Sequence, residues 1–135
     1  MVGIIVLLSI RKHMFSPYKE ISKYVTQNEA TLRMDCERYL EQKYVNQSDD
    51  EVKATGIYKG DTDIVQYDFS GKGIAPASIY YGFYYSPDDI PVPYDNADYD
   101  LELKSADEWT WDGVGDNGGI IRKICENWYY YEAWF

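Results

Sequence analysis

Apolar residues recur at helical spacing in the first third of the chain. Ser16-Pro17 is typical of a helix start, with serine as the N-cap and proline at the first helical position. Thr26-Gln27-Asn28-Glu29 matches a capping box, whose Thr and Glu side chains satisfy free backbone N–H groups. After it, apolar side chains at i, i+4, i+7 and i+8 share one helical face: Leu32, Cys36, Tyr39 and Leu40. We expect a helical segment that ends near Tyr44 and packs through this face.

After residue 50 the apolar period changes from 3.6 to 2, which predicts strands. Apolar and polar residues alternate on either side of residues 59–63, which are typical of a turn. Residues 51–69 should therefore form a hairpin. A third strand is expected from Ala77 to Ser86. It must end there because the segment 87–93 contains three prolines, which cannot donate to a strand ladder. Further strands are expected at 99–103, 109–111, 120–125 and 128–135.

These elements predict an α+β domain: an N-terminal helical segment packed on a twisted antiparallel sheet of about five to six strands. The composition favours the sheet, because 17% of the 135 residues are aromatic, with 15 Tyr and 4 Trp. Such rings suit a pleated, half-buried surface. We find no internal repeat and no linker in the sequence, so residues 16–135 are expected to form one domain.

The N-terminal segment, residues 1–15, contains an apolar run at positions 4–10 that is followed at once by Arg11-Lys12-His13. The run is much shorter than the roughly 20 residues that span a bilayer, and it lacks the features of a complete signal peptide. Two interpretations remain open. The run is either a buried strand or helix start, or the trailing end of a membrane anchor. The basic residues behind it argue mildly against export.

The charge of the chain is unevenly distributed. Residues 1–45 hold seven Lys or Arg and five Asp or Glu, whereas residues 46–135 hold six and eighteen, and the net charge is −10. An acidic body repels phosphate backbones, so nucleic-acid binding through a basic patch is disfavoured. The same charge would attract cations or a basic partner, or would simply keep the surface solvated.

Alternating aromatic residues in the third and last predicted strands form the first candidate site. Tyr80 and Tyr84 share a strand face with Gly82 and Ser86, and three rings of the last strand share a face with Glu132. Because Gly, Ser and Glu suit solvent, we predict that these faces are exposed. The rings of such an aromatic platform, suited to a sugar face or a protein partner, are Tyr80, Tyr84, Trp128, Tyr130 and Trp134. The alternative, which aromatic stripes more often indicate, is that the helix covers one face and loops the other, so that most rings are core.

The second candidate is an acidic loop with four aspartates: Asp88, Asp89, Asp95 and Asp98. Clustered carboxylates with loop carbonyls can hold calcium. However, the spacing of Asp112, Asp116 and Asn117 further on does not match an EF-hand. We therefore interpret the loop as solvated, and we predict neither a metal nor a cofactor.

Residues that usually perform catalysis are sparse. The single histidine, His13, flanks the apolar run, which argues against histidine-based acid–base or triad chemistry. Cys36 and Cys125 fit either one disulfide or two buried thiols, and neither lies in a C-x-x-C motif. Paired carboxylates of a glycosidase are the only enzymatic chemistry that can be outlined, and we expect a protein that is not an enzyme.

Two aromatic strings, residues 80–89 and 127–135, together with Phe15-Ser16-Pro17, resemble a group of small uncharacterised proteins of Gram-positive bacteria with YYGFYYSxDD and NWYYYxAWF patterns. The resemblance covers most of residues 15–135. These proteins often have a hydrophobic N-terminal anchor, so the resemblance implies an envelope-associated domain and favours the anchor interpretation of the N-terminal segment. It implies no activity and no catalytic residues.

We therefore expect a non-enzymatic binding domain of the bacterial cell envelope, extracytoplasmic and membrane-associated. It would use exposed Tyr and Trp, with nearby Asp, to engage a partner protein or a cell-wall carbohydrate. The alternative is an intracellular protein of the immunity or antitoxin kind, whose acidic body binds a basic partner.

Overall fold

The computed structural model describes residues 16–47, 50–69 and 79–135. Two helices, α2 (Tyr18–Gln27) and α3 (Glu29–Gln42), come first in this part of the chain. Seven strands follow in the described residues: β1 (Val52–Tyr58), β2 (Ile64–Phe69), β3 (Ile79–Tyr85), β4 (Glu102–Ser105), β5 (Glu108–Asp112), β6 (Gly118–Cys125) and β7 (Trp128–Trp134). The predicted α+β class, with a helical segment before an antiparallel sheet, is confirmed.

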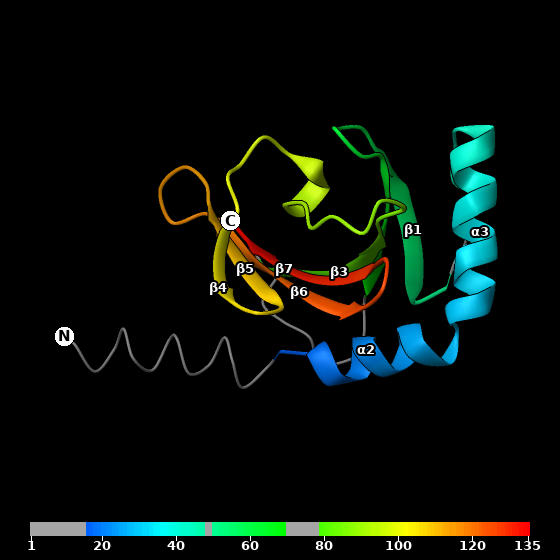
Figure 1. The fold of residues 1–135 in the computed structure, drawn as a ribbon, viewed down its shortest axis with the longest axis horizontal. Coiled ribbons are helices and arrows are strands. Elements are labelled where there is room, and N and C mark those ends of the chain that lie inside the picture. The colour runs from blue at the N-terminus through cyan, green and yellow to red at the C-terminus, as the bar shows by residue number, and fades with distance from the viewer. Residues whose placement is uncertain (1–15, 48–49, 70–78) are drawn as a thin grey trace.

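The strands form one sheet in the order β1-β2-β3-β7-β6-β5-β4, and neighbouring strands are antiparallel. β7 is last in the chain but lies between β3 and β6, so it pairs on both sides. Because β3 and β4 are not neighbours, residues 86–101 must cross the sheet; we call them the crossover segment. In Figure 1 this segment, with the short 3-10 helix η1 (Tyr94–Asn96), lies on the opposite side of the sheet from α2, while α3 stands beside β1.

Side chains are buried on both faces of the sheet. The helix face packs against α2 and α3 through Ile21, Val25, Leu32, Cys36, Tyr39, Tyr67, Phe83, Tyr85, Trp128 and Tyr130. The crossover face packs against the crossover segment through Tyr84, Val92, Trp111, Ile121, Tyr129 and Tyr131, with Tyr94, Tyr99 and Leu101 partly buried. Burying one large apolar side chain is worth about 1.5–3 kcal/mol, so these rings are a main source of stability. The predicted apolar face of α3 is confirmed, because it supplies part of the core on the helix face of the sheet.

A glycine allows close packing at the centre of the sheet. Gly82 in β3 pairs with Tyr131 in β7, and the Tyr131 hydroxyl donates to the backbone carbonyl of Tyr67 at 2.9 Å. A Cβ atom at Gly82 would overlap both that carbonyl oxygen and the Tyr131 ring. Gly82 is therefore buried beneath a tyrosine, and the prediction that its face of β3 is open to solvent is wrong.

The helical segment ends near Tyr44 as predicted, but it differs from the prediction at its start, where Pro17 is the N-cap residue of α2 and not its first helical residue, and at its junction. It divides at Asn28 into two helices, and no side chain caps the second one. The Thr26 hydroxyl donates back to two carbonyls of its own helix, so the predicted capping box is not formed. α3 ends at Gln42, and Lys43 adopts a left-handed conformation (φ 71°) that stops the helix just before Tyr44.

The strands follow the prediction closely, with three differences. The 51–69 hairpin and the break after Ser86 are confirmed, and the third strand is described from Ile79 onward. The described part of the chain contributes seven strands to the sheet, more than the five to six predicted. The strand predicted at 99–103 begins only at Glu102, because Tyr99 and Leu101 pack on the crossover face instead. β6 begins two residues before the predicted 120.

The predicted N-terminal segment 1–15, with His13, lies outside the described residues. In the ranges that the structure describes, none of the helices is both long and apolar enough to cross a bilayer. Cys36 and Cys125 are free thiols, so the structure does not contain the disulfide of the first sequence alternative, and it matches the second alternative, two buried thiols, only at Cys36. Cys36 is buried and Cys125 is half-buried.

Candidate functional site

The five rings of the predicted platform lie on two different faces of the sheet. Antiparallel partners share a face: Tyr84 pairs with Tyr129 on the crossover face, whereas Trp128 pairs with Tyr85 on the helix face. Tyr80 is thus on the side of Tyr84, whereas Tyr130 and Trp134, at even spacing from Trp128, lie with it on the helix face. Tyr84, Trp128 and Tyr130 are at most 1% exposed. The prediction of one exposed platform is therefore wrong, and the alternative, in which helices and loops cover the two faces, is confirmed for most of these rings.

Glu132, predicted from the sequence to lie on a solvent-exposed face, is buried at 5% exposure on the helix face. Its Oε2 accepts hydrogen bonds from the Tyr130 hydroxyl at 2.7 Å and the Ser16 hydroxyl at 2.9 Å. Burial, followed by the charge of Glu132, raises the pKa of Tyr130. A buried carboxylate is tolerated when it is hydrogen-bonded, and here it fastens the start of α2 to the central strand.

Three aromatic rings remain at the rim of the crossover face: Tyr80, Tyr94 and Phe135, which we call the rim cluster. Tyr80 and Tyr94 are stacked with centroids 6.0 Å apart, and Phe135 meets them at 6.0 and 5.7 Å with steeply inclined planes. Tyr80 is 42% exposed and Phe135 49%, while Tyr94 is half-buried and rests on Tyr131 at 5.2 Å. The rim cluster therefore packs on Tyr131 on one side and is exposed to solvent on the other.

Asp95, one of the four predicted acidic-loop residues, adjoins the rim cluster. Gln66 holds it through two contacts: its amide donates to Asp95 Oδ1 at 2.8 Å, and its carbonyl accepts from the Asp95 N–H at 2.9 Å. Burial raises the pKa of Asp95, partly offset by the Gln66 hydrogen bond. Burial and then the charge of Asp95 raise the pKa of Tyr94. The carboxylate and the ring are thus close enough to influence each other.

The other acidic-loop residues lie elsewhere. Asp89 is half-buried in a polar network, whereas Asp88 and Asp98 are exposed. Asp98 lines an open groove of about 400 Å³, which we call the acidic groove, with Asp100, Glu102 and Asp112 as further carboxylates. In its wall Tyr99 and Trp111 stack on each other at 4.6 Å. Within the described residues no group of His, Cys, Asp and Glu is arranged to hold a metal ion.

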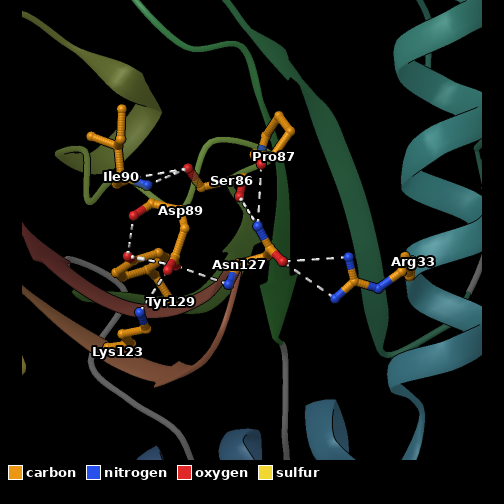
Figure 2. A network of polar contacts seen from close by, with 8 residues as sticks. All are labelled: Arg33, Ser86, Pro87, Asp89, Ile90, Lys123, Asn127 and Tyr129. Carbon is orange, nitrogen blue, oxygen red and sulfur yellow. Dashed lines mark hydrogen bonds and ion pairs between the residues drawn. The ribbon is translucent and has the colours of Figure 1, made fainter.

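The polar network joins the crossover segment to the turn between β6 and β7 (Figure 2). Asp89 accepts hydrogen bonds from the Asn127 N–H at 2.9 Å, the Tyr129 hydroxyl at 2.9 Å and the Lys123 ammonium at 2.8 Å. The Asn127 side-chain amide donates to the carbonyls of Ser86 and Pro87 at 3.0 and 3.2 Å. Both Asp89 (φ 54°) and Asn127 (φ 74°) are left-handed, a conformation that Asn and Asp tolerate better than most residues.

The network acts as a clamp and is poorly suited to acid–base chemistry. Burial alone would raise the pKa of Asp89, but hydrogen bonds from Lys123, Asn127 and Tyr129 outweigh it and the pKa is lowered. The hydrogen bond to Asp89 raises the pKa of Lys123. Both groups therefore stay charged near neutral pH, away from the pKa range of an efficient general acid or base. Arg33 of α3 approaches Asn127 Oδ1 at 3.4 Å and extends the clamp towards the helices.

The rim cluster was predicted only in part. Of its three rings, Tyr80 was among the candidate residues, whereas Tyr94 and Phe135 were not; the adjoining Asp95 was an acidic-loop candidate. The alternation of side chains along β7 puts Phe135 on the same face as Tyr131, so the sequence pattern could have placed Phe135 on the crossover face. Tyr94 follows a proline in an irregular segment, where no periodicity indicates its direction. Comparisons of the chain with protein-family models, curated proteins and solved structures found no match.

Proposed function

We propose that this chain is a non-enzymatic binding domain of the bacterial cell envelope, which engages a partner protein or a cell-wall carbohydrate through the rim cluster and Asp95. One observation supports this proposal above others. Tyr80 and Phe135 are exposed and in contact with each other, whereas the other tyrosines of β3 and β7 are at most 5% exposed. Exposed apolar residues such as Tyr44, which follows α3, and Leu103 in β4 lie elsewhere in the chain.

The geometry of the rim cluster suits binding. Rings that are already packed against one another lose little conformational entropy when a ligand covers them, and aromatic side chains supply much of the binding energy in protein interfaces. Asp95 adds a carboxylate at the edge of these rings, and Gln66 fixes its position. A sugar hydroxyl or a donor of a partner protein would find an acceptor there.

Site-specific photo-cross-linking in source cells tests the proposal. A benzophenone amino acid replaces Tyr80 in one version of the protein and Tyr44, which is 61% exposed at the end of the helical segment, in a matched control. We expect a cross-linked product from position 80 that is absent from position 44. Digestion of the product with a protease or a wall-degrading muramidase then distinguishes a protein from a carbohydrate. Equal products from both positions, or none from position 80, would contradict the proposal.

The proposed location needs its own experiment, because binding does not require the envelope. Intact source cells that express the protein with its native upstream sequence are treated with an external protease. Loss of the C-terminal strand from an immunoblot is the expected result, with a cytoplasmic protein as the control. Protection that disappears only on lysis would place the domain inside the cell.

The acidic groove favours a second candidate function, an intracellular protein that neutralises a basic partner. Four carboxylates line this groove, and its lining includes no Lys or Arg. Such a surface speeds the encounter with a basic protein, and salt weakens the attraction. Under this candidate, the double variant Asp98→Asn/Asp112→Asn should slow association with the partner, whereas Tyr80→Leu should not. The opposite pattern supports the rim cluster.

A further inference from the structure

Among the described residues, two carboxylates act electrostatically on the rim cluster and on the Tyr131 ring beneath it. Asp95 adjoins Tyr94, and the pKa values of Tyr94 and Tyr131 are raised first by burial and then by charges that include those of Asp95 and Asp68. Cation–π contacts of the described residues involve other rings, those of Tyr18, Tyr39, Tyr85 and Tyr129. The chain as a whole has a net charge of −10. Two rings of the rim cluster, Tyr80 and Phe135, thus combine exposure to solvent with carboxylates nearby.

We infer that the rim cluster binds the cationic side chain of an arginine or lysine on a basic polypeptide partner. The inference rests on the proposed function, since it names the ligand class of the same surface. The face of an aromatic ring is electron-rich and attracts a cation within about 6 Å of its centroid. Asp95, the neighbour of Tyr94 in η1, supplies a half-buried carboxylate that would pair with the same cation. Charge complementarity therefore favours a basic polypeptide over a neutral glycan.

Arginine fits the geometry best. Its planar guanidinium stacks on aromatic faces and can also form a bidentate pair with a carboxylate. The stacked pair Tyr80 and Tyr94 offers the face, and Asp95 offers the carboxylate. Because Gln66 already orients Asp95, binding would not require the carboxylate to reorganise.

An NMR titration of the whole chain with a defined peptide tests the inference. The probe is Ac-Gly-Arg-Gly-Arg-Gly-amide at low ionic strength, and the matched probe carries citrulline, the neutral isostere of arginine. We expect the arginine peptide to shift the ring resonances of Tyr80, Tyr94 and Phe135, and the citrulline peptide to leave them nearly unchanged. Added salt should weaken the binding of the arginine peptide.

Matched variants locate the binding. Tyr80→Leu should lower the affinity for the arginine peptide about two- to fivefold, the range expected for one exposed cation–π contact. Tyr44→Leu should leave this affinity unchanged. Asp95→Asn, which retains the oxygen that accepts from Gln66, should also weaken binding, whereas Asp98→Asn in the acidic groove should not. The dispersion of the NMR spectrum confirms that each variant is folded.

Three results would overturn the inference: equal shifts from the two peptides, unchanged ring resonances in the rim cluster, or shifts confined to the acidic groove. These results are distinguishable from failure of the proposed function. If position 80 cross-links in cells but the arginine peptide leaves the rim cluster unchanged, the binding domain stands and its ligand is not cationic. If no cross-link forms at position 80, the proposed function itself fails.

Discussion

The hydroxyl group of Tyr84 forms two hydrogen bonds with the backbone of Val92, donating to the carbonyl at 2.9 Å and accepting from the N–H at 2.8 Å. Tyr84 belongs to the central part of the sheet, and Val92 belongs to the crossover segment. Both residues are buried. This pair fixes the crossover segment on the sheet and so places Tyr94, two residues further on, in the rim cluster.

Removing this hydroxyl should destabilise the fold. Tyr84→Phe leaves the N–H and carbonyl of Val92 buried without their partner, and we expect the free energy of unfolding to fall by about 2–3 kcal/mol. Urea denaturation followed by fluorescence measures it. The control is Tyr44→Phe at an exposed site, where we expect a change within about 0.5 kcal/mol. Equal effects of the two variants would show that the hydrogen bonds to Val92 do not contribute to the free energy of unfolding.

A methyl group at position 82 should not be accommodated. Because its Cβ would overlap the Tyr67 carbonyl and the Tyr131 ring, Gly82→Ala must shift the central strands. We expect a loss of about 3 kcal/mol or more, at the upper end for overpacked cores. Gly56→Ala in β1 is the control, because its Cβ would meet no atom closer than 3.5 Å. Thermal unfolding compares the two variants, and a wild-type midpoint for Gly82→Ala would contradict the prediction.

The turn between β6 and β7 allows backbone strain to be separated from hydrogen bonding. Asn127→Gly retains freedom at φ 74° but loses the amide bonds to Ser86 and Pro87, which should cost about 1–3 kcal/mol. Asn127→Ala loses the same bonds and adds roughly 1 kcal/mol of left-handed strain. Chemical denaturation should therefore rank wild type above Gly and Gly above Ala. An Ala variant as stable as the Gly variant would remove the strain argument.

Asp89 should make the protein sensitive to acid. A carboxyl group whose pKa is lower in the folded state stabilises the fold above its unfolded pKa, here an ordinary value of 3.8. This contribution is lost as the pH falls through the folded pKa. The free energy of unfolding of the wild type should therefore fall more steeply than that of Asp89→Asn between about pH 5 and about pH 2.

Asp95 provides the opposite control in the same measurement. Burial raises its pKa, so protonation favours the folded state and its contribution to stability increases as the pH falls through the folded pKa. Asp95→Asn should remove this increase and make the acid-induced loss steeper. Parallel pH profiles for both variants and the wild type would show that neither carboxyl group is coupled to folding.

The two thiols should differ in reactivity. Burial raises the pKa of Cys36 to about 12, although the nearby Tyr67 hydroxyl, 3.3 Å from the sulfur, opposes the rise. Cys125 is half-buried, and burial raises its pKa as well. Because the thiolate is the reactive form, iodoacetamide at pH 8 should alkylate Cys125 slowly and Cys36 only after denaturation. Mass spectrometry of the two peptides over time measures this, and rapid labelling of native Cys36 would contradict it.

Much of the fold could be predicted because the signals are local. The period of Leu32, Cys36 and Tyr39 places one side of α3 in the core, whatever that side packs against. The prolines after Ser86 end β3 because they lack the N–H that a ladder requires. The alternation of β3 and β7 assigned each ring to the correct side of its own strand.

The candidate site was predicted less well because exposure is not local. Glu132 and Gly82 are small or polar and suggested solvent, yet one is hydrogen-bonded beneath α2 and the other lies under the Tyr131 ring. The acidic loop looked like one feature in the sequence. Its residues separate because Asp89 bonds to the β6–β7 turn and Asp95 bonds to β2.

The sequence by itself determined where helices and strands form and which side chains share a face, because backbone preference and side-chain period act over a few neighbouring residues. Tertiary structure alone decided the strand order, with β7 at the centre, and hence which faces are paired and covered. These outcomes depend on contacts between residues far apart in the chain, such as Tyr84 with Tyr129 and Gln66 with Asp95. For this reason only Tyr80 of the predicted rings became part of the rim cluster.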